Sequence, residues 1–146
     1  MQSLSTLSQV TFYILLALIG LMTLIILVWQ IQVLRGKAMI NPDGTADSWQ
    51  EQKIFYGIAT ADSFLACPLS IIGILLVSIN PRFGIYLLAL VSFWLLWANI
   101  MTTTTSLRFE KPRITPGWFI AFPFGALVGL AFLLWTLFNF DSIYSM

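Results

Sequence analysis

Asp62 is the residue of this sequence whose type and position most favour chemistry, because it is the one ionisable side chain well inside a long apolar segment. A charged side chain at the centre of a bilayer costs roughly 2.5–3.5 kcal/mol on insertion scales, so such residues usually face a bundle interior or a cavity. Small residues recur near Asp62 at helical spacings and share one face with it. These residues are Ala59, Ala66 and Gly73. We therefore expect this face to pack against other helices.

The height of Asp62 in a helix bundle can be counted from the turn that follows it. If the chain turns at Asn80 and Pro81, residues at equal height have numbers that sum to about 161, because both helices rise equally per residue. Asp62 is then level with Asn99, and the same count across the next loop puts Pro123 at that level too. Pro123 also leaves a backbone carbonyl one turn earlier without its usual donor. Two threonines continue the Asn99 face toward the membrane surface. The predicted ligand- or proton-binding residues are Asp62, Asn99, Thr102, Thr103 and Pro123.

Two interpretations of Asp62 stay open at this stage. In the first, it binds a proton, a cation or the polar end of an amphiphilic ligand. In the second, it is a structural, protonated acid that is hydrogen-bonded to Asn99. Because Arg108 lies nine residues beyond Asn99, about 13 Å along a helix, we expect no cation within reach. Burial then favours the neutral form of Asp62.

The composition excludes most familiar catalysis. Histidine is absent and Cys67 is the single cysteine, which removes histidine-ligated metals, Ser-His-Asp triads and paired thiols. An aspartyl hydrolase needs a second carboxylate, but Asp141 lies roughly 27 Å beyond the level of Pro123 by helix rise. No phosphate-binding loop or basic stretch supports a nucleic acid partner, and the net charge is only +1. We predict a protein that is not an enzyme and has no metal site, and the sequence leaves any cofactor unknown.

The elements that position Asp62 follow from the apolar segments. Of the 146 residues, 59% are hydrophobic and 9% are charged, against roughly 25% charged in soluble domains. Capping residues followed by proline, at Asn80 and Thr115, mark two helix starts. Ser48 and Glu51 fit a capping box, and Pro68 is expected to bend the second helix. The sequence predicts an all-α, four-helix transmembrane bundle that forms one membrane domain over residues 1–146, with spans at about 10–34, 53–79, 82–106 and 116–139.

Orientation and packing follow from charge and from small residues. Six of the seven lysines and arginines fall in the first and third loops, and only Arg82 lies on the other side, so both termini should be extracytoplasmic. Tryptophans near the loop side predict an interfacial belt: Trp29, Trp49, Trp97 and Trp118. The fourth span carries a stripe of small residues for close helix contact: Ala121, Gly125 and Gly129. We expect the partner of this stripe within the chain, with a second copy as the alternative.

Three functions fit these observations. The first is a membrane protein, in the inner (plasma) membrane of a bacterium, that binds a lipid or an apolar or amphiphilic small molecule near Asp62. The second is a small proton-coupled transporter that uses Asp62 and acts as a homo-oligomer. With four spans and one buried acid, the chain resembles the small multidrug exporters in outline, although their acid lies in the first span and here that span has none. The third is an accessory or assembly subunit of a larger membrane complex.

Overall fold

The computed structural model describes residues 4–36, 56–110 and 113–144. Every regular element in these ranges is helical. The predicted capping box at Ser48 and the belt residue Trp49 lie outside the described residues. The elements are α1 (Thr6–Leu34), a helical stretch over 56–61, the π-helical turn η1 (Asp62–Ala66), α3 (Cys67–Ile79), α4 (Pro81–Thr105), η2 (Ser106–Glu110), α5 (Pro116–Ala121), α6 (Pro123–Phe138) and α7 (Phe140–Tyr144).

Side-chain caps set the starts of three helices. The Oγ of Ser5 accepts the N–H of Ser8 at 3.2 Å at the start of α1. Asn80 Oδ1 accepts from the third residue of α4, and Thr115 Oγ1 accepts from Trp118 N–H at 3.1 Å in α5. The predicted starts at Asn80 and Thr115 are therefore confirmed, each followed by a proline in the first turn, where its missing N–H has no cost.

Three of the helices are long and apolar enough to cross a membrane. They are Thr6–Leu34, Tyr56–Ile79 and Pro81–Arg108. The predicted fourth span is divided: α5 ends at Ala121, Phe122 has φ −115° and ψ −78°, and α6 begins at Pro123. Proline has no N–H to continue the ladder of α5, which explains the break. With 16 residues, α6 is shorter than the other three apolar helices.

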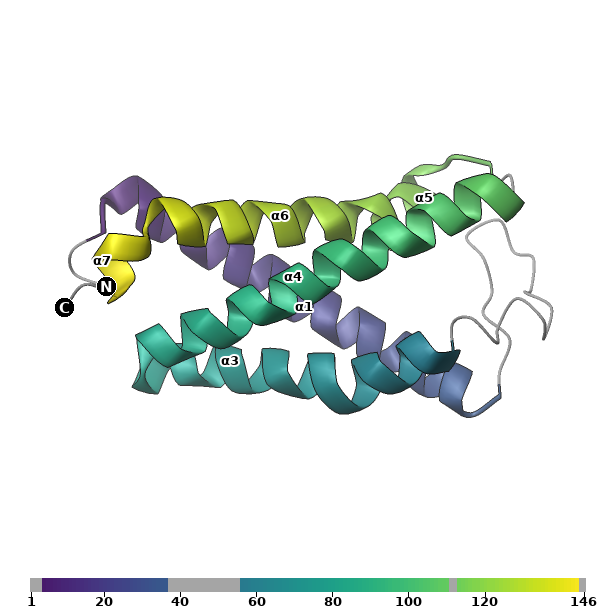
Figure 1. The fold of residues 1–146 in the computed structure, drawn as a ribbon, viewed down its shortest axis with the longest axis horizontal. Coiled ribbons are helices and arrows are strands. Elements are labelled where there is room, and N and C mark those ends of the chain that lie inside the picture. The colour runs from purple at the N-terminus through teal and green to yellow at the C-terminus, as the bar shows by residue number, and fades with distance from the viewer. Residues whose placement is uncertain (1–3, 37–55, 111–112, 145–146) are drawn as a thin grey trace.

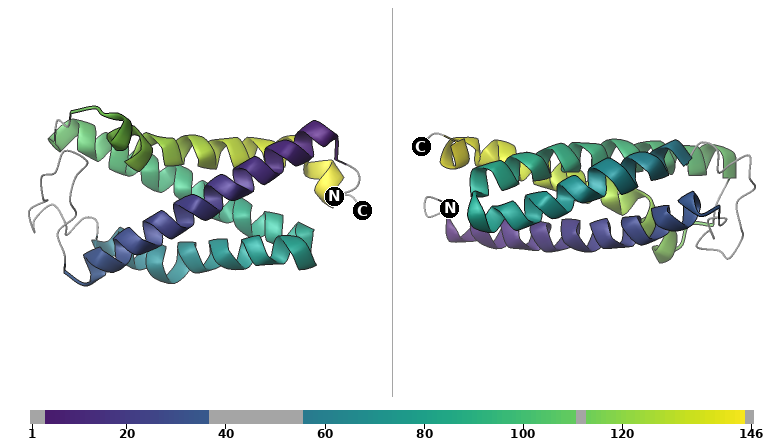
Figure 2. Two further views of the ribbon diagram at one scale, coloured as in Figure 1. Left: turned by 180° about the vertical axis from the view of Figure 1, so that it is seen from behind. Right: turned by 90° about the horizontal axis from the view of Figure 1, so that it is seen from below.

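The long helices cross instead of running parallel. Figure 1 shows α4 running diagonally from the end of α3 to α5, and Figure 2 shows α1 crossing the opposite face along the other diagonal. As a result, α1 lies against α6 near its N-terminal end and against η1 and α3 near its C-terminal end, while α4 packs on both α3 and α6. The C-terminal half of α1 therefore diverges from α5 (Figures 1 and 2).

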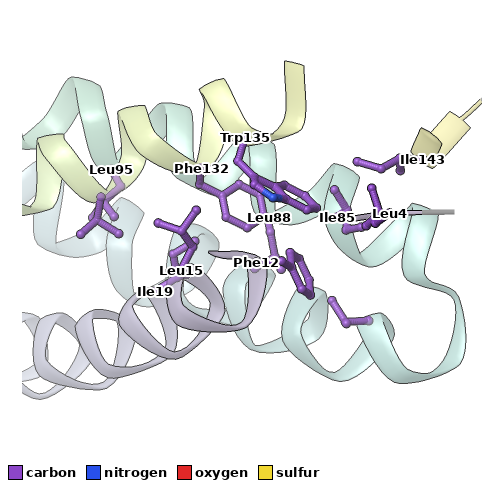
Figure 3. Packing of buried hydrophobic residues seen from close by; sticks show 12 residues of the cluster. Leu4, Phe12, Leu15, Ile19, Ile85, Leu88, Leu95, Phe132, Trp135 and Ile143 are labelled. Atoms are coloured by element: carbon purple, nitrogen blue, oxygen red, sulfur yellow. The ribbon is translucent and has the colours of Figure 1, made fainter. Parts of the chain in front are cut away.

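The close packing lies in the half of the molecule that holds α7 and the start of α1. Phe12 of α1 packs on Trp135 of α6 with ring centroids 4.8 Å apart, and Leu88 of α4 and Phe132 fill the space beside them (Figure 3). All four side chains are buried. The fourth helix approaches α4 closely at Gly129, where an added Cβ would lie 2.5 Å from the carbonyl oxygen of Ser92.

Candidate functional site

Asp62 opens the π-helical turn between the helical stretch 56–61 and α3. The N–H of Cys67 bonds to the carbonyl oxygen of Asp62, five residues earlier, which is the π-helical pattern. Pro68 follows directly. Because proline has no N–H, it cannot donate to the carbonyl of Phe64, which accounts for the irregular backbone here. The bend predicted at Pro68 thus takes the form of a π-turn just before it, and Asp62 is at its start.

The carboxyl group of Asp62 is held by two side chains from two other helices. Trp94 Nε1 in α4 donates to Oδ1 at 2.6 Å, and Gln30 Nε2 in α1 donates to Oδ2 at 2.8 Å. Asp62 is 6% exposed. One donor on each oxygen is the arrangement that suits an ionised carboxylate. If the Gln30 amide turned by 180°, its Oε1 would face Oδ2 and would serve the protonated acid equally well.

The hydrogen bond between Asp62 and Asn99, which one of the two interpretations of Asp62 required, is not formed. Asn99 Nδ2 donates at 2.8 Å to the carbonyl oxygen of Leu95 in its own helix. Level counting assumes straight helices of equal rise, whereas the π-turn places an extra residue beside Asp62. In addition, the long indole of Trp94 reaches Asp62 although Trp94 lies five residues before Asn99 in α4. Sequence reasoning overlooked Trp94 and Gln30. The signal for both was that each carries a side-chain N–H inside an apolar segment, where a buried acid is a suitable acceptor.

Asp62 and Asn99 nevertheless lie in the wall of one cavity of about 310 Å³. The residues that line the cavity come mainly from the C-terminal half of α1, from α4 and from α5 with the start of α6. Its rim is exposed at Leu21, Ile25 and Ile120. Almost all of its lining is apolar, and the acid, amide and hydroxyl side chains among its lining residues are Gln30, Asp62, Asn99 and Thr102. We call these four residues the polar pole.

The divided fourth helix forms one wall of this cavity. Ala121 and Phe122, at the end of α5, line it together with Phe124 of α6. Pro123 has no N–H, so the carbonyl of Phe119 loses its usual helical donor. Irregular backbone at membrane depth is tolerated where it is buried in protein or lines a cavity, and in transporters broken helices frequently border the binding site.

A smaller cavity of about 40 Å³ lies deeper, between α1, α3 and α4, and has room for a water molecule. Asp62 and Asn99 line it too, beside Thr23 and Cys67. Thr23 Oγ1 and Ser70 Oγ lie 2.7 Å apart, and Cys67 Sγ is 3.7 Å from the carbonyl oxygen of Thr23. Polar groups therefore continue from the polar pole into the middle of the bundle.

The remaining predicted site residues have separate places. Thr102 lines the large cavity, while Thr103 and Pro123 are not among its lining residues. The Oγ1 of Thr103 is buried and has no hydrogen-bond partner among the described residues. Trp118, predicted to lie in the interfacial belt, is instead 5% exposed and donates from Nε1 to Ser106 Oγ at 3.1 Å. Trp29 and Trp97 are exposed.

The predicted packing residues lie at helix contacts or on cavity walls. Ala59 is fully buried, and a Cβ at Gly73 would lie 3.0 Å from the side chain of Leu88. Gly125 faces the side-chain amide of Asn99, and Gly129 faces the backbone of α4, so the stripe of the fourth helix has a partner within the chain. Ala66 lines the smaller cavity and Ala121 the larger one.

Comparisons with protein-family models, with curated proteins and with solved structures find no match to this chain.

Proposed function

We propose that this chain is a membrane protein, not an enzyme, that binds one lipid or one apolar or amphiphilic small molecule in the cavity beside Asp62. The proposal takes the chain as a four-helix transmembrane bundle, with α5 and α6 together as the fourth span. It places both termini outside the cytoplasm, as the distribution of lysine and arginine favours, and it takes the membrane to be the inner membrane of a bacterium.

One observation carries the proposal: an apolar cavity opens at the side of the bundle and ends at a hydrogen-bonded acid. Its volume of about 310 Å³ falls within the usual range for small-molecule sites, and a few convergent polar groups in an apolar wall are typical of such sites. The rim residues Leu21, Ile25 and Ile120 face outward, where the hydrocarbon of a bilayer would meet them. A molecule could therefore enter from the membrane without crossing water.

Filling the cavity tests the proposal. Ala121 lines the cavity, so Ala121→Phe should place a ring inside it. Ala17 is an exposed alanine of α1 away from the cavity, so Ala17→Phe is the matched control. Each protein is purified in mild detergent, and the retained small molecules are measured by mass spectrometry.

We expect the wild type and Ala17→Phe to retain the same molecule in about equal amounts with the protein, and Ala121→Phe to lose it. Equal retention by all three proteins would place the molecule on the lipid-facing surface and contradict the proposal. Other polypeptides that copurify in constant ratio, with no retained small molecule, would favour the role of a subunit in a larger complex.

A proton-coupled transporter is the second candidate, and Gln30 is the observation in its favour. Because the Gln30 amide can present either its N–H or its oxygen to Oδ2, the same two side chains, Gln30 and Trp94, can hold Asp62 with or without a proton. A transporter of this kind would lose proton-driven uptake into vesicles in Asp62→Asn. Retention of the uptake by that variant would exclude Asp62 as the coupling residue.

A further inference from the structure

We infer that the cavity takes an amphiphile whose polar end is a protonated amine, with its N–H groups directed at Asp62. This inference rests on the proposed binding function and adds the chemical class of the ligand. The argument comes from the hydrogen-bond capacity and the charge that the polar pole offers to a guest.

The side-chain nitrogens of Trp94, Gln30 and Asn99 each donate to an acceptor within the chain, and each of the two amide groups keeps a second N–H. Trp94 Nε1 and Gln30 Nε2 donate to Asp62, and Asn99 Nδ2 donates to Leu95. The hydroxyl of Thr102 donates at 3.0 Å to the carbonyl oxygen of Ala98. A carboxylate has about four acceptor sites, so Asp62 keeps about two after these contacts.

One oxygen at the polar pole has no donor within the described part of the chain. Gln30 Oε1 is buried and has no hydrogen-bond partner among the described residues. A buried acceptor without a donor costs roughly 1–3 kcal/mol, so a guest that donates to it gains that energy back. The ligand complementary to this pole is a hydrogen-bond donor.

The charge of the pole points to the same ligand. Asp62 is the one charged side chain that lines the cavity within the described residues, and no lysine or arginine lines it. The two side chains that donate to Asp62 are neutral, so they stabilise the carboxylate but leave its net negative charge unchanged. A cationic guest would compensate the carboxylate in a low-dielectric site, whereas a phosphate or carboxylate headgroup would meet a like charge.

The apolar wall specifies the rest of the molecule. Leu18, Met22 and Ile26 of α1 face Phe122 and Phe124 across the cavity. Such a wall suits an alkyl chain or an aromatic body attached to the amine. Because the rim is open, a chain longer than the cavity can extend into the surrounding hydrocarbon.

Three probes of equal chain length separate the parts of this inference. Decylamine is charged and has N–H groups to donate. Decanol has no charge and no N–H, and decyltrimethylammonium is charged but has no N–H. Their affinities are measured by calorimetry on the full chain in nanodiscs, with empty nanodiscs as the background. We expect decylamine to bind about ten- to a hundredfold more tightly than decanol, which corresponds to one hydrogen bond with a charged group. Decyltrimethylammonium should bind more weakly than decylamine because it has no N–H to donate.

Asp62→Asn should remove the preference for the amine, so that decylamine binds this variant no more tightly than decanol does. The wild-type comparison needs no variant, so the inference stays testable even if Asp62→Asn does not fold. Equal binding of decylamine and decanol, both lost in Ala121→Phe, would overturn the amine and keep the proposed function. Binding of neither probe, or binding unchanged in Ala121→Phe, would overturn the proposed function itself.

Discussion

Gly129→Ala should weaken the bundle, because its new methyl group has no space against α4. The added Cβ would lie 2.5 Å from Ser92 O and 2.9 Å from Leu96 N, and both are backbone atoms that cannot rotate away. Overpacking of this kind costs typically about 1–3 kcal/mol, while replacing glycine by alanine inside a helix returns about 1 kcal/mol. The expected net loss of stability is therefore roughly 0–2 kcal/mol.

Gly57→Ala isolates the packing cost. Gly57 is helical, and an added Cβ there would have nothing within 4 Å, so this variant has the same gain in helix propensity and no clash. The propensity gain cancels in the comparison and the full packing cost of about 1–3 kcal/mol remains. At roughly 2–4 °C per kcal/mol, Gly129→Ala should melt about 2–12 °C below Gly57→Ala.

The single cysteine supplies the assay. Cys67 is 3% exposed, so a thiol-reactive fluorophore should label it only as the bundle opens, and labelling against temperature gives the midpoint in detergent. Midpoints of the two variants within about a degree of each other would show that Gly129 does not face α4 and would refute the packing described for the fourth helix.

Three further predictions use other parts of the chain. Infrared difference spectra between the wild type and Asp62→Asn should show a carboxylate band for Asp62 when decylamine is bound; a protonated carboxyl band in that complex contradicts the ion pair. Thr23→Val and Ser70→Ala should each cost about 1 kcal/mol and together less than their sum, because they share one hydrogen bond of 2.7 Å; strictly additive melting shifts would deny that bond. Cysteines introduced at Ser3 and Ser145, in a chain without Cys67, should react with a membrane-impermeant reagent from outside intact cells; reaction only after lysis would reverse the orientation.

The regular parts of the fold could be predicted because local signals set them. The caps at Asn80 and Thr115 and the long apolar segments give the helix starts and three membrane-length helices directly. The break of the fourth helix at Phe122 could be predicted only in part from the sequence. Pro123 signals a lost hydrogen bond, but a proline can either kink or divide a helix, and the surrounding packing decides between them.

The candidate site was harder to predict because it depends on crossing angles and side-chain reach. Counting levels placed Asp62 and Asn99 at the same height, and both line one cavity, yet the partners of Asp62 are Gln30 and Trp94. Which helices meet at Asp62 follows from the diagonal paths of α1 and α4, which hydropathy does not encode. A buried tryptophan and an interfacial one also look alike in sequence, as Trp118 shows.

Photo-crosslinking tests the central claim most directly, because it reports where an amphiphile binds. Decylamine with a diazirine at the middle of its chain is irradiated with the protein in nanodiscs, and the labelled residues are identified by mass spectrometry. The account predicts labels on the cavity wall, over residues 18–26 of α1 and 117–124 of α5 and α6, that excess decylamine removes. Labels confined to outward side chains such as Leu75, Phe93 and Leu137, unaffected by excess decylamine, would contradict it.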